Sequence, residues 1–370
     1  MWDAVTSITL KIDYGWRLRP LPTGLFTALT DFEINNATVE SSELGTLVSS
    51  RCSRLRSLGL CIKLVAASNI HLRSDSLQSL SFRIQNARRL EVDAPKLEAI
   101  TIHEAIWLHI TAPELAKVTW NGNRVYHPHC HQLTMAARHL RLLESCSHRI
   151  AASLLRSFDE VDKLILNVDE SSKETLGYTS VNETTTLPKS DTSHISLGDY
   201  HSLASTIMLH LLRICNRTRK LSVNLYHFAD PLKKNNFCPL SCHCRLPMTT
   251  SLTDGINLSL LEEVEIKCFR SSQGQLQFLE WLSECTAEIL ENLVIYTDPF
   301  EKGTSLTKEI CKKIPKMFRP NLDVIFMLYS DERLVRFDYI PKTCKSVPFW
   351  SLHVHPYSNS YPCVNKDCCC

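Results

Sequence analysis

The chain has 370 residues, of which 44% are hydrophobic, and its formal net charge is +2 at pH 7. This length is enough to bury a large core, in one elongated solenoid or in two domains. The near-neutral charge gives no electrostatic footprint for nucleic acid or for an anionic membrane, so we expect neither as a partner. Only 10 glycines are present, and neither glycine-rich phosphate-binding motif occurs.

The N-terminus lacks the charged segment and apolar run of a signal peptide, and no stretch approaches the roughly 18 consecutive apolar residues of a membrane-spanning helix. We therefore expect a cytoplasmic or nuclear protein whose 16 cysteines are reduced thiols. The chain ends in Cys368, Cys369 and Cys370 but has no prenylation box, because Asp367 occupies the position where that motif needs cysteine.

The first predicted elements share an apolar pattern of the form Leu-x-x-Leu-x-Leu, which begins at Leu29 and again at Leu55. Alternating apolar residues point to one side of a short strand, and the residues between them face solvent. A strand is also expected around residues 5–12, and an amphipathic helix at 43–52. One strand cannot bury its apolar face alone, so several such units must stack.

From residue 77 to residue 120 the pattern recurs at nearly constant spacing. Its copies begin at Leu77, Leu97 and Leu115, at steps of 20 and 18 residues, and Pro95 and Pro113 each stand two residues before a copy. Proline fits a corner between coils because it lacks an N–H donor. Self-similarity of this period is typical of a leucine-rich solenoid.

Two shorter apolar alternations, at 90–92 and 108–110, lie between these copies. We interpret them as return strands on the opposite face of each coil. An ordinary antiparallel β-protein built from hairpins is the alternative. The Ala-Pro repeats favour the solenoid, because they carry no Asn-Gly or Asp-Gly hairpin signal.

After residue 120 the periodicity predicts helices that alternate with strands. Helices are expected at 147–158 and 203–214, and strands at 161–168 and 221–225. Residues 169–198 are rich in Ser, Thr, Glu and Asp, which predicts a mobile insertion between the two units.

The C-terminal half continues this alternation. The expected order is strand 261–269, helix 271–282, strand 289–296, helix 305–314 and strand 322–328. The predicted fold class is therefore an α/β leucine-rich-repeat solenoid, with strand-rich coils in the N-terminal half and helix–strand repeats in the C-terminal half.

Several motifs carry a resemblance: the two Ala-Pro-x-Leu copies, the Cys-Pro-x-x-Cys-x-Cys loop at 238–244 and the Leu-Glu-Glu-Val-Glu-Ile strand at 261–266. Together they resemble the plant F-box/leucine-rich-repeat proteins that end in an FBD-type domain. The helix–strand pair at 275–296 looks like the core of that domain. The resemblance implies a substrate-recruiting subunit of an SCF-type ubiquitin ligase, in which the F-box binds a Skp-type adaptor and the repeats hold the target.

One part of the family pattern is missing. The F-box should precede the repeats, and only Leu21-Pro22 echoes its opening, while Phe32 and Ile34 fit a strand instead. We therefore expect no F-box here, and a Skp-type adaptor only if an F-box is present upstream.

The expected domains follow from these elements. They are leucine-rich-repeat coils with Ala-Pro turns at 1–120, irregular helix–strand repeats at 121–236, an FBD-like helix–strand unit at 237–330 and a poorly ordered, cysteine-ending tail at 331–370. The leading function is protein–protein interaction, without enzymatic activity or cofactor. The alternatives are a truncated or degenerate family member that binds no adaptor, and a zinc-binding structural module.

Outward-facing residues of the predicted strands are the candidate contacts for a protein target. They are Arg83, Glu91, His103, Trp107, His109 and Lys117, of which Glu91 and His109 fall on return strands. Trp107 is the best single anchor, because aromatic side chains dominate many interfaces. The alternative is that Trp107 packs under the adjoining loop.

Two clusters offer metal-ligand chemistry without standard spacing. Cys238, Cys242, His243 and Cys244 have thiolates and an imidazole that suit zinc, but no second ligand pair lies at a finger distance. A second cluster contains His127, His129, Cys130 and His131. A solvated loop is favoured over a metal site in both places.

Overall fold

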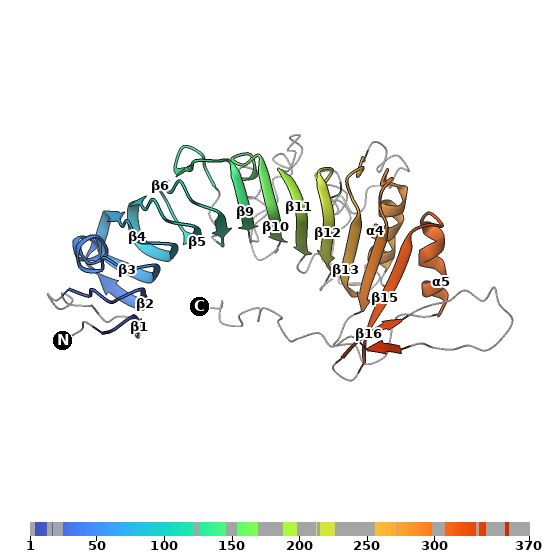
Figure 1. Cartoon of the computed structure of the whole chain (residues 1–370), viewed down its shortest axis with the longest axis horizontal. Helices are drawn as coiled ribbons and strands as arrows, with labels where there is room; N and C mark the ends of the chain where they lie inside the picture. The colour runs from blue at the N-terminus through green and yellow to red at the C-terminus, as the bar shows by residue number, and fades with distance from the viewer. Residues whose placement is uncertain are drawn as a thin grey trace, which may run out of the picture.

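The computed structural model describes residues 4–12, 17, 25–121, 126–145, 154–168, 188–197, 212, 215–225, 256–271, 273–297, 308–330, 333–337 and 352–354. The elements follow one another along an arc from β1 to β15 (Figure 1). Within this part of the chain, no helix has both the length and the apolar character needed to cross a bilayer.

Most elements are strands. Their bounds are β1 Ser7–Lys11, β2 Asp31–Val39, β3 Ser57–Arg73, β4 Ser79–Asp93, β5 Ala99–Glu104, β6 Leu108–Thr111, β7 Lys117–Trp120, β8 His131–Thr134, β9 His139–Ser145, β10 Glu160–Val168, β11 Lys189–Leu197, β12 Thr218–Asn224, β13 Glu263–Phe269, β14 Asn292–Thr297, β15 Asp323–Ser330, β16 Arg333–Phe337 and β17 Leu352–Val354.

Parallel pairing joins β1 to β15 into two ladders. The front ladder runs from β1 to β15 through β2, the first parts of β3 and β4, β5, β7 and β9–β14. The return ladder contains the second parts of β3 and β4 together with β6 and β8. The return strands expected at 90–92 and 108–110 lie in it. Parallel coils with only neighbouring contacts are what a solenoid requires.

The core lies between the ladders and follows the front ladder along the arc. Leu80, Ile100 and Val118 occupy equivalent register positions on successive strands and are all buried. The same position is taken by Leu58 on one side and by Leu143 and Leu164 on the other. Period-two alternation therefore places one apolar row in a continuous interior, as the sequence predicts.

A tight turn precedes the front strands of the coils that begin with Ala-Pro. The Leu97 N–H donates to the Ala94 carbonyl, and the Leu115 N–H donates to the Ala112 carbonyl. All four side chains are buried, whereas Pro95 is exposed at the corner. The Ala-Pro-x-Leu motif thus supplies two small or apolar core residues and a corner residue that needs no backbone partner.

Helices pack against the sheet at both ends of the arc. α1, Ser41–Thr46, continues into a π-helical turn over Leu47–Arg51 and packs on β3. The backbone of α1 lies close to that of β3, because a Cβ added at Gly45 would lie 3.1 Å from the His71 carbonyl oxygen. Near the other end, α4, Gln273–Glu284, and α5, Lys308–Met317, lie on one side of the strands (Figure 1).

The structure differs from the sequence-based organisation in three places. The two-ladder coils continue past residue 120, since β8 and β9 extend them to Ser145. The predicted insertion at 169–198 contains β11, which is paired on both sides by β10 and β12. The predicted poorly ordered tail contains two strands: β16 pairs antiparallel with β15, and β17 pairs antiparallel with β16.

A cluster of buried hydroxyls explains why β11 is hard to recognise. Ser193 takes the core position that Leu164 occupies on β10 and Leu221 on β12. Its Oγ lies 2.9 Å from Ser190 Oγ and 3.0 Å from Thr218 Oγ1, and the last two hydroxyls are 3.1 Å apart. Each buried hydroxyl therefore has a partner, so the core accepts polar residues that no apolar pattern reveals.

Candidate protein-binding surface

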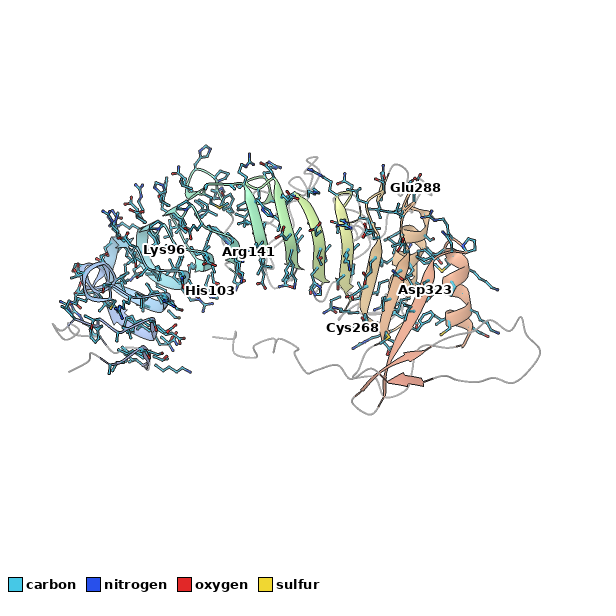
Figure 2. The ribbon with its side chains drawn as sticks, in the orientation of Figure 1. Lys96, His103, Arg141, Cys268, Glu288 and Asp323 are labelled. Atoms are coloured by element: carbon cyan, nitrogen blue, oxygen red, sulfur yellow. The ribbon has the colours of Figure 1, made fainter. Side chains whose placement is uncertain are left out.

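The residues between the core positions of the front ladder form one outward row. In register order this row contains Glu33, Gly59, Ser81, Thr101, Thr119, Glu144, Ile165, His194, Ser222, Glu265, Val294 and Ile325. Figure 2 marks the two edges of this ladder: His103 and Cys268 lie near the carboxyl ends of β5 and β13, and Glu288 lies at the opposite edge.

Three of the predicted contact residues, Arg83, His103 and Lys117, belong to the front ladder. Arg83 and Lys117 are exposed, and His103 is partly buried. Partial burial lowers the pKa of His103 below its usual value, and the nearby Arg83 guanidinium lowers it further. At neutral pH this imidazole is therefore uncharged beside a cation.

Two other predicted contacts, Glu91 and His109, lie opposite one another on the return ladder. Glu91 Oε2 lies 3.1 Å from His71 Nδ1, and Glu91 Oε1 lies 2.8 Å from Arg89 Nε. The hydrogen bond with His71 lowers the pKa of Glu91, and Arg89 and His109 add smaller electrostatic contributions. These contacts engage Glu91 within the protein itself. Because Glu91 and His109 lie on the return ladder and the three residues above lie on the front ladder, the six candidates do not form one patch.

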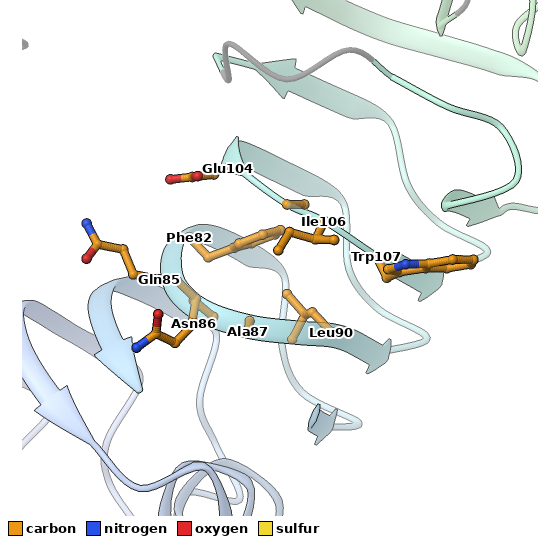
Figure 3. Close-up of a pocket in the computed structure, with 10 residues that line it drawn as sticks. Phe82, Gln85, Asn86, Ala87, Leu90, Glu104, Ile106 and Trp107 are labelled. Atoms are coloured by element: carbon orange, nitrogen blue, oxygen red, sulfur yellow. The ribbon is translucent and has the colours of Figure 1, made fainter. Parts of the chain in front are cut away.

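Trp107 lies at the corner where the front strand β5 turns toward the return strand β6. Its exposed fraction is 47% and that of neighbouring Ile106 is 45%. A pocket of about 340 Å³ opens beside them (Figure 3). It is lined by Phe82, Ile84, Gln85, Asn86, Ala87, Leu90, Glu104, Ala105, Ile106 and Trp107. Trp107 is thus an exposed pocket wall rather than a side chain covered by a loop.

Asn86 gives the pocket rim its shape. Its φ of 65° lies in the left-handed region, which asparagine tolerates better than most residues. Its side-chain amide donates to the Leu64 carbonyl of the preceding coil at 3.2 Å. The corner of β4 is therefore tied to the corner of β3, which holds the rim in place.

An aromatic cluster packs inside the neighbouring coil. The ring centroids of Trp120 and Tyr126 are 5.4 Å apart in an edge-to-face arrangement, and the His131 ring lies 5.1 Å from Trp120. His131 is buried, and its Nδ1 accepts a hydrogen bond from the His127 N–H at 2.9 Å. Burial lowers the pKa of His131, and a hydrogen bond with the Ala105 backbone raises it in part.

Three partly or fully buried histidines are expected to make the fold sensitive to acid. The pKa values of His103, His131 and His194 are all lowered in the folded state, chiefly by burial. The unfolded chain then binds more protons near pH 6.5, so we expect stability to fall as the pH drops below about 6.5. Thermal unfolding midpoints measured from pH 8 to pH 5 would show this loss. His131→Gln should flatten the curve, and an unchanged slope in that variant would contradict the assignment to His131.

Of the two cysteine–histidine clusters, only the one at 127–131 lies in the described part of the chain. No group of three or more His, Cys, Asp and Glu residues there is placed to hold a metal ion, which includes the cluster at 127–131. In that cluster His131 Nδ1 is occupied by a backbone N–H. Cys238, Cys242, His243 and Cys244 lie outside the described residues.

Several cysteines are core residues. Burial raises the pKa of the Cys52 and Cys311 thiols to about 11 and that of the Cys215 and Cys285 thiols to about 12. A thiol with so high a pKa is a poor nucleophile at neutral pH. These four side chains therefore act as packing groups.

Sequence reasoning missed Ile106, Asn86 and Glu104 as parts of the surface. The pair Ile106-Trp107 interrupts the period-two alternation between β5 and β6, since two large apolar residues stand side by side where one should face solvent. That interruption is a signal that can be read before the structure is known. Asn86 and Glu104 carry no such signal.

Comparison with known families agrees with this architecture. Residues 7–123 match the family model described as FBD-associated F-box protein At5g56370, LRR repeats. No curated protein and no solved structure gives a significant match to the chain. The matched range covers β1 to β7, including both Ala-Pro coils and the corner pocket. Residues 7–123 are therefore similar to the leucine-rich repeats of the FBD-associated F-box proteins.

Proposed function

We propose that this protein recognises another protein, and that the corner pocket with Ile106 and Trp107 is the main contact site. One observation carries the proposal: two large apolar side chains, each almost half exposed, stand beside a pocket lined mainly by apolar residues in a leucine-rich-repeat segment. Aromatic side chains next to pockets supply much of the binding free energy in protein interfaces. Leucine-rich repeats of an F-box-associated family fit an interaction role.

The finer proposal follows the family resemblance. The solenoid would act as the substrate-recognition part of a plant F-box/leucine-rich-repeat subunit of an SCF-type ubiquitin ligase, in the cytoplasm or nucleus. The strand–helix–strand–helix–strand segment from β13 to β15 would be an FBD-type unit. The outward residues Arg83, His103 and Lys117 would contact the same target from the front ladder.

Replacement of Trp107 by alanine tests the contact site. We expect Trp107→Ala to weaken partner binding by about 2 kcal/mol, or roughly 30-fold, because a large apolar anchor is lost. The measurement is affinity capture of partners from plant extract, followed by a titration with the partner that is recovered. Leu260→Ala is a matched control, since Leu260 is also a large apolar residue, 43% exposed, between β12 and β13. Equal losses in both variants would contradict the proposal.

The same capture separates the alternatives. Recovery of a Skp-type adaptor together with a target supports the ligase proposal, whereas a target without adaptor favours a truncated or degenerate member that binds no adaptor. Metal analysis of the purified protein tests the zinc-binding alternative that involves Cys238, Cys242, His243 and Cys244. Stoichiometric zinc would support that module.

A further inference from the structure

We propose that the corner pocket binds one bulky apolar side chain of a partner segment whose neighbouring residues are acidic. This inference rests on the proposed function and names the chemistry of the partner. It follows from three features of the corner: the size and lining of the pocket, the apolar track that leads to it, and the unbalanced charge around it.

The pocket has the size and lining for a single side chain. Its volume of about 340 Å³ is at the lower end of the range for ligand pockets. Phe82, Ile84 and Leu90 are buried core residues that form its floor, while Ile106 and Trp107 form an exposed wall. Figure 3 shows Glu104 and Gln85 placed away from Trp107, so polar groups lie toward one end. An apolar side chain would complete the packing of this wall.

An apolar track extends from the pocket over the preceding coil. Val65 is 39% exposed at the corner of β3, and Ala66 and Ala67 beside it are exposed. The register pairs Ser68 with Ala87, so this corner lies against the pocket lining of β4. A peptide that runs along the corners can therefore keep apolar contact across two coils.

The surroundings of the track carry more cations than carboxylates. Lys63 is paired in register with Gln85, and Arg88 follows Ala87 directly; neither cation forms an ion pair with any described residue. The other two cations have carboxylates nearby: Arg89 forms an ion pair with Glu91, and Arg83 on β4 is paired in register with Glu104 on β5. Among the described residues, the charges of Lys63 and Arg88 are therefore left without a carboxylate partner, and acidic residues of a partner would neutralise them.

Labelled peptides of equal length test the inference by fluorescence anisotropy on the full chain. One peptide has a central Leu-Phe pair flanked by Asp and Glu, one has the same pair flanked by Lys and Arg, and one has Ala-Ala flanked by Asp and Glu. We expect the acidic apolar peptide to bind at least about tenfold more tightly than either other peptide, and its binding to weaken with salt. Equal binding of the acidic and basic peptides, or no binding by any of them, would overturn the inference.

A charge reversal with a matched control localises the effect. Arg88→Glu should weaken binding of the acidic apolar peptide about fivefold, because an exposed charge contact is modest in water. Arg54→Glu makes the same change on the Cys52–Leu55 turn at the other end of the front strand, roughly 20 Å away, and should leave binding unchanged. Equal effects of the two variants would show unspecific attraction and overturn the inference.

The contact site at Trp107 and the acidic preference of the partner can be disproved separately. If Trp107→Ala abolishes capture of the partner but peptide charge has no effect, the docking function stands and the acidic preference is wrong. If Trp107→Ala leaves capture unchanged, the pocket is not the contact site and both proposals fall.

Discussion

Replacement of Trp120 by alanine is expected to lower the free energy of unfolding by about 3–5 kcal/mol. Trp120 is only 1% exposed and is among the largest fully buried side chains in the described chain. The variant leaves a cavity against Tyr126 and His131, whose rings contact the indole. Because each coil packs on its neighbours, the cavity weakens the coils on both sides of β7.

Two measurements isolate this effect. Thermal unfolding gives the loss of global stability, and amide hydrogen exchange in β7 and β9 reports local opening. Trp107→Ala removes the same side chain from an exposed position 47% open to solvent, so we expect its effect to stay below about 1 kcal/mol. Equal losses in the two variants would contradict the assignment of Trp120 to the core and Trp107 to the surface.

Thr101→Pro is expected to destabilise the protein by about 3 kcal/mol or more. Thr101 lies in β5, which is paired with β4 on one side and with β7 on the other. Proline removes an N–H from a strand that has hydrogen-bonding partners on both sides, and its ring crowds the adjacent strand. The Thr101 side chain faces outward, so the variant changes the backbone without removing core volume.

Thr101→Ala is the control for the lost side chain and should cost less than about 1 kcal/mol. Urea unfolding of both variants compares them directly. If Thr101→Pro unfolds at the same urea concentration as Thr101→Ala, β5 is not an interior strand and the continuous ladder is wrong.

The fold of the first coils could be predicted because two physical demands leave marks in the sequence. Core positions such as Ile100 and Ile102 alternate with period two, and the corners after the return strands at 90–92 and 108–110 accept a residue without an N–H donor, such as Pro95. β11 could not be predicted, because Ser190 and Ser193 satisfy each other's hydroxyls inside the core and thus resemble a solvated loop.

The surface was harder to predict than the fold. Exposure of an outward residue follows from alternation, which places Arg83 and Lys117 correctly on the front ladder. Which exposed residues lie side by side depends on where a coil bends. The bend in β4 at Asn86 is produced by one left-handed backbone angle. For this reason Trp107 could be singled out, but the pocket beside it, built from residues 82–90 and 104–107 of two neighbouring coils, could not.

The in-register pairing of each coil with its predecessor bears on how the chain acquires its structure during synthesis. From β1 to β15 each front strand pairs with the one made shortly before it, so no early segment must wait for a distant one. The entropy of closing each loop is therefore incurred in small and similar steps. Coils can add to the growing end as they leave the ribosome, and apolar strands spend little time unprotected.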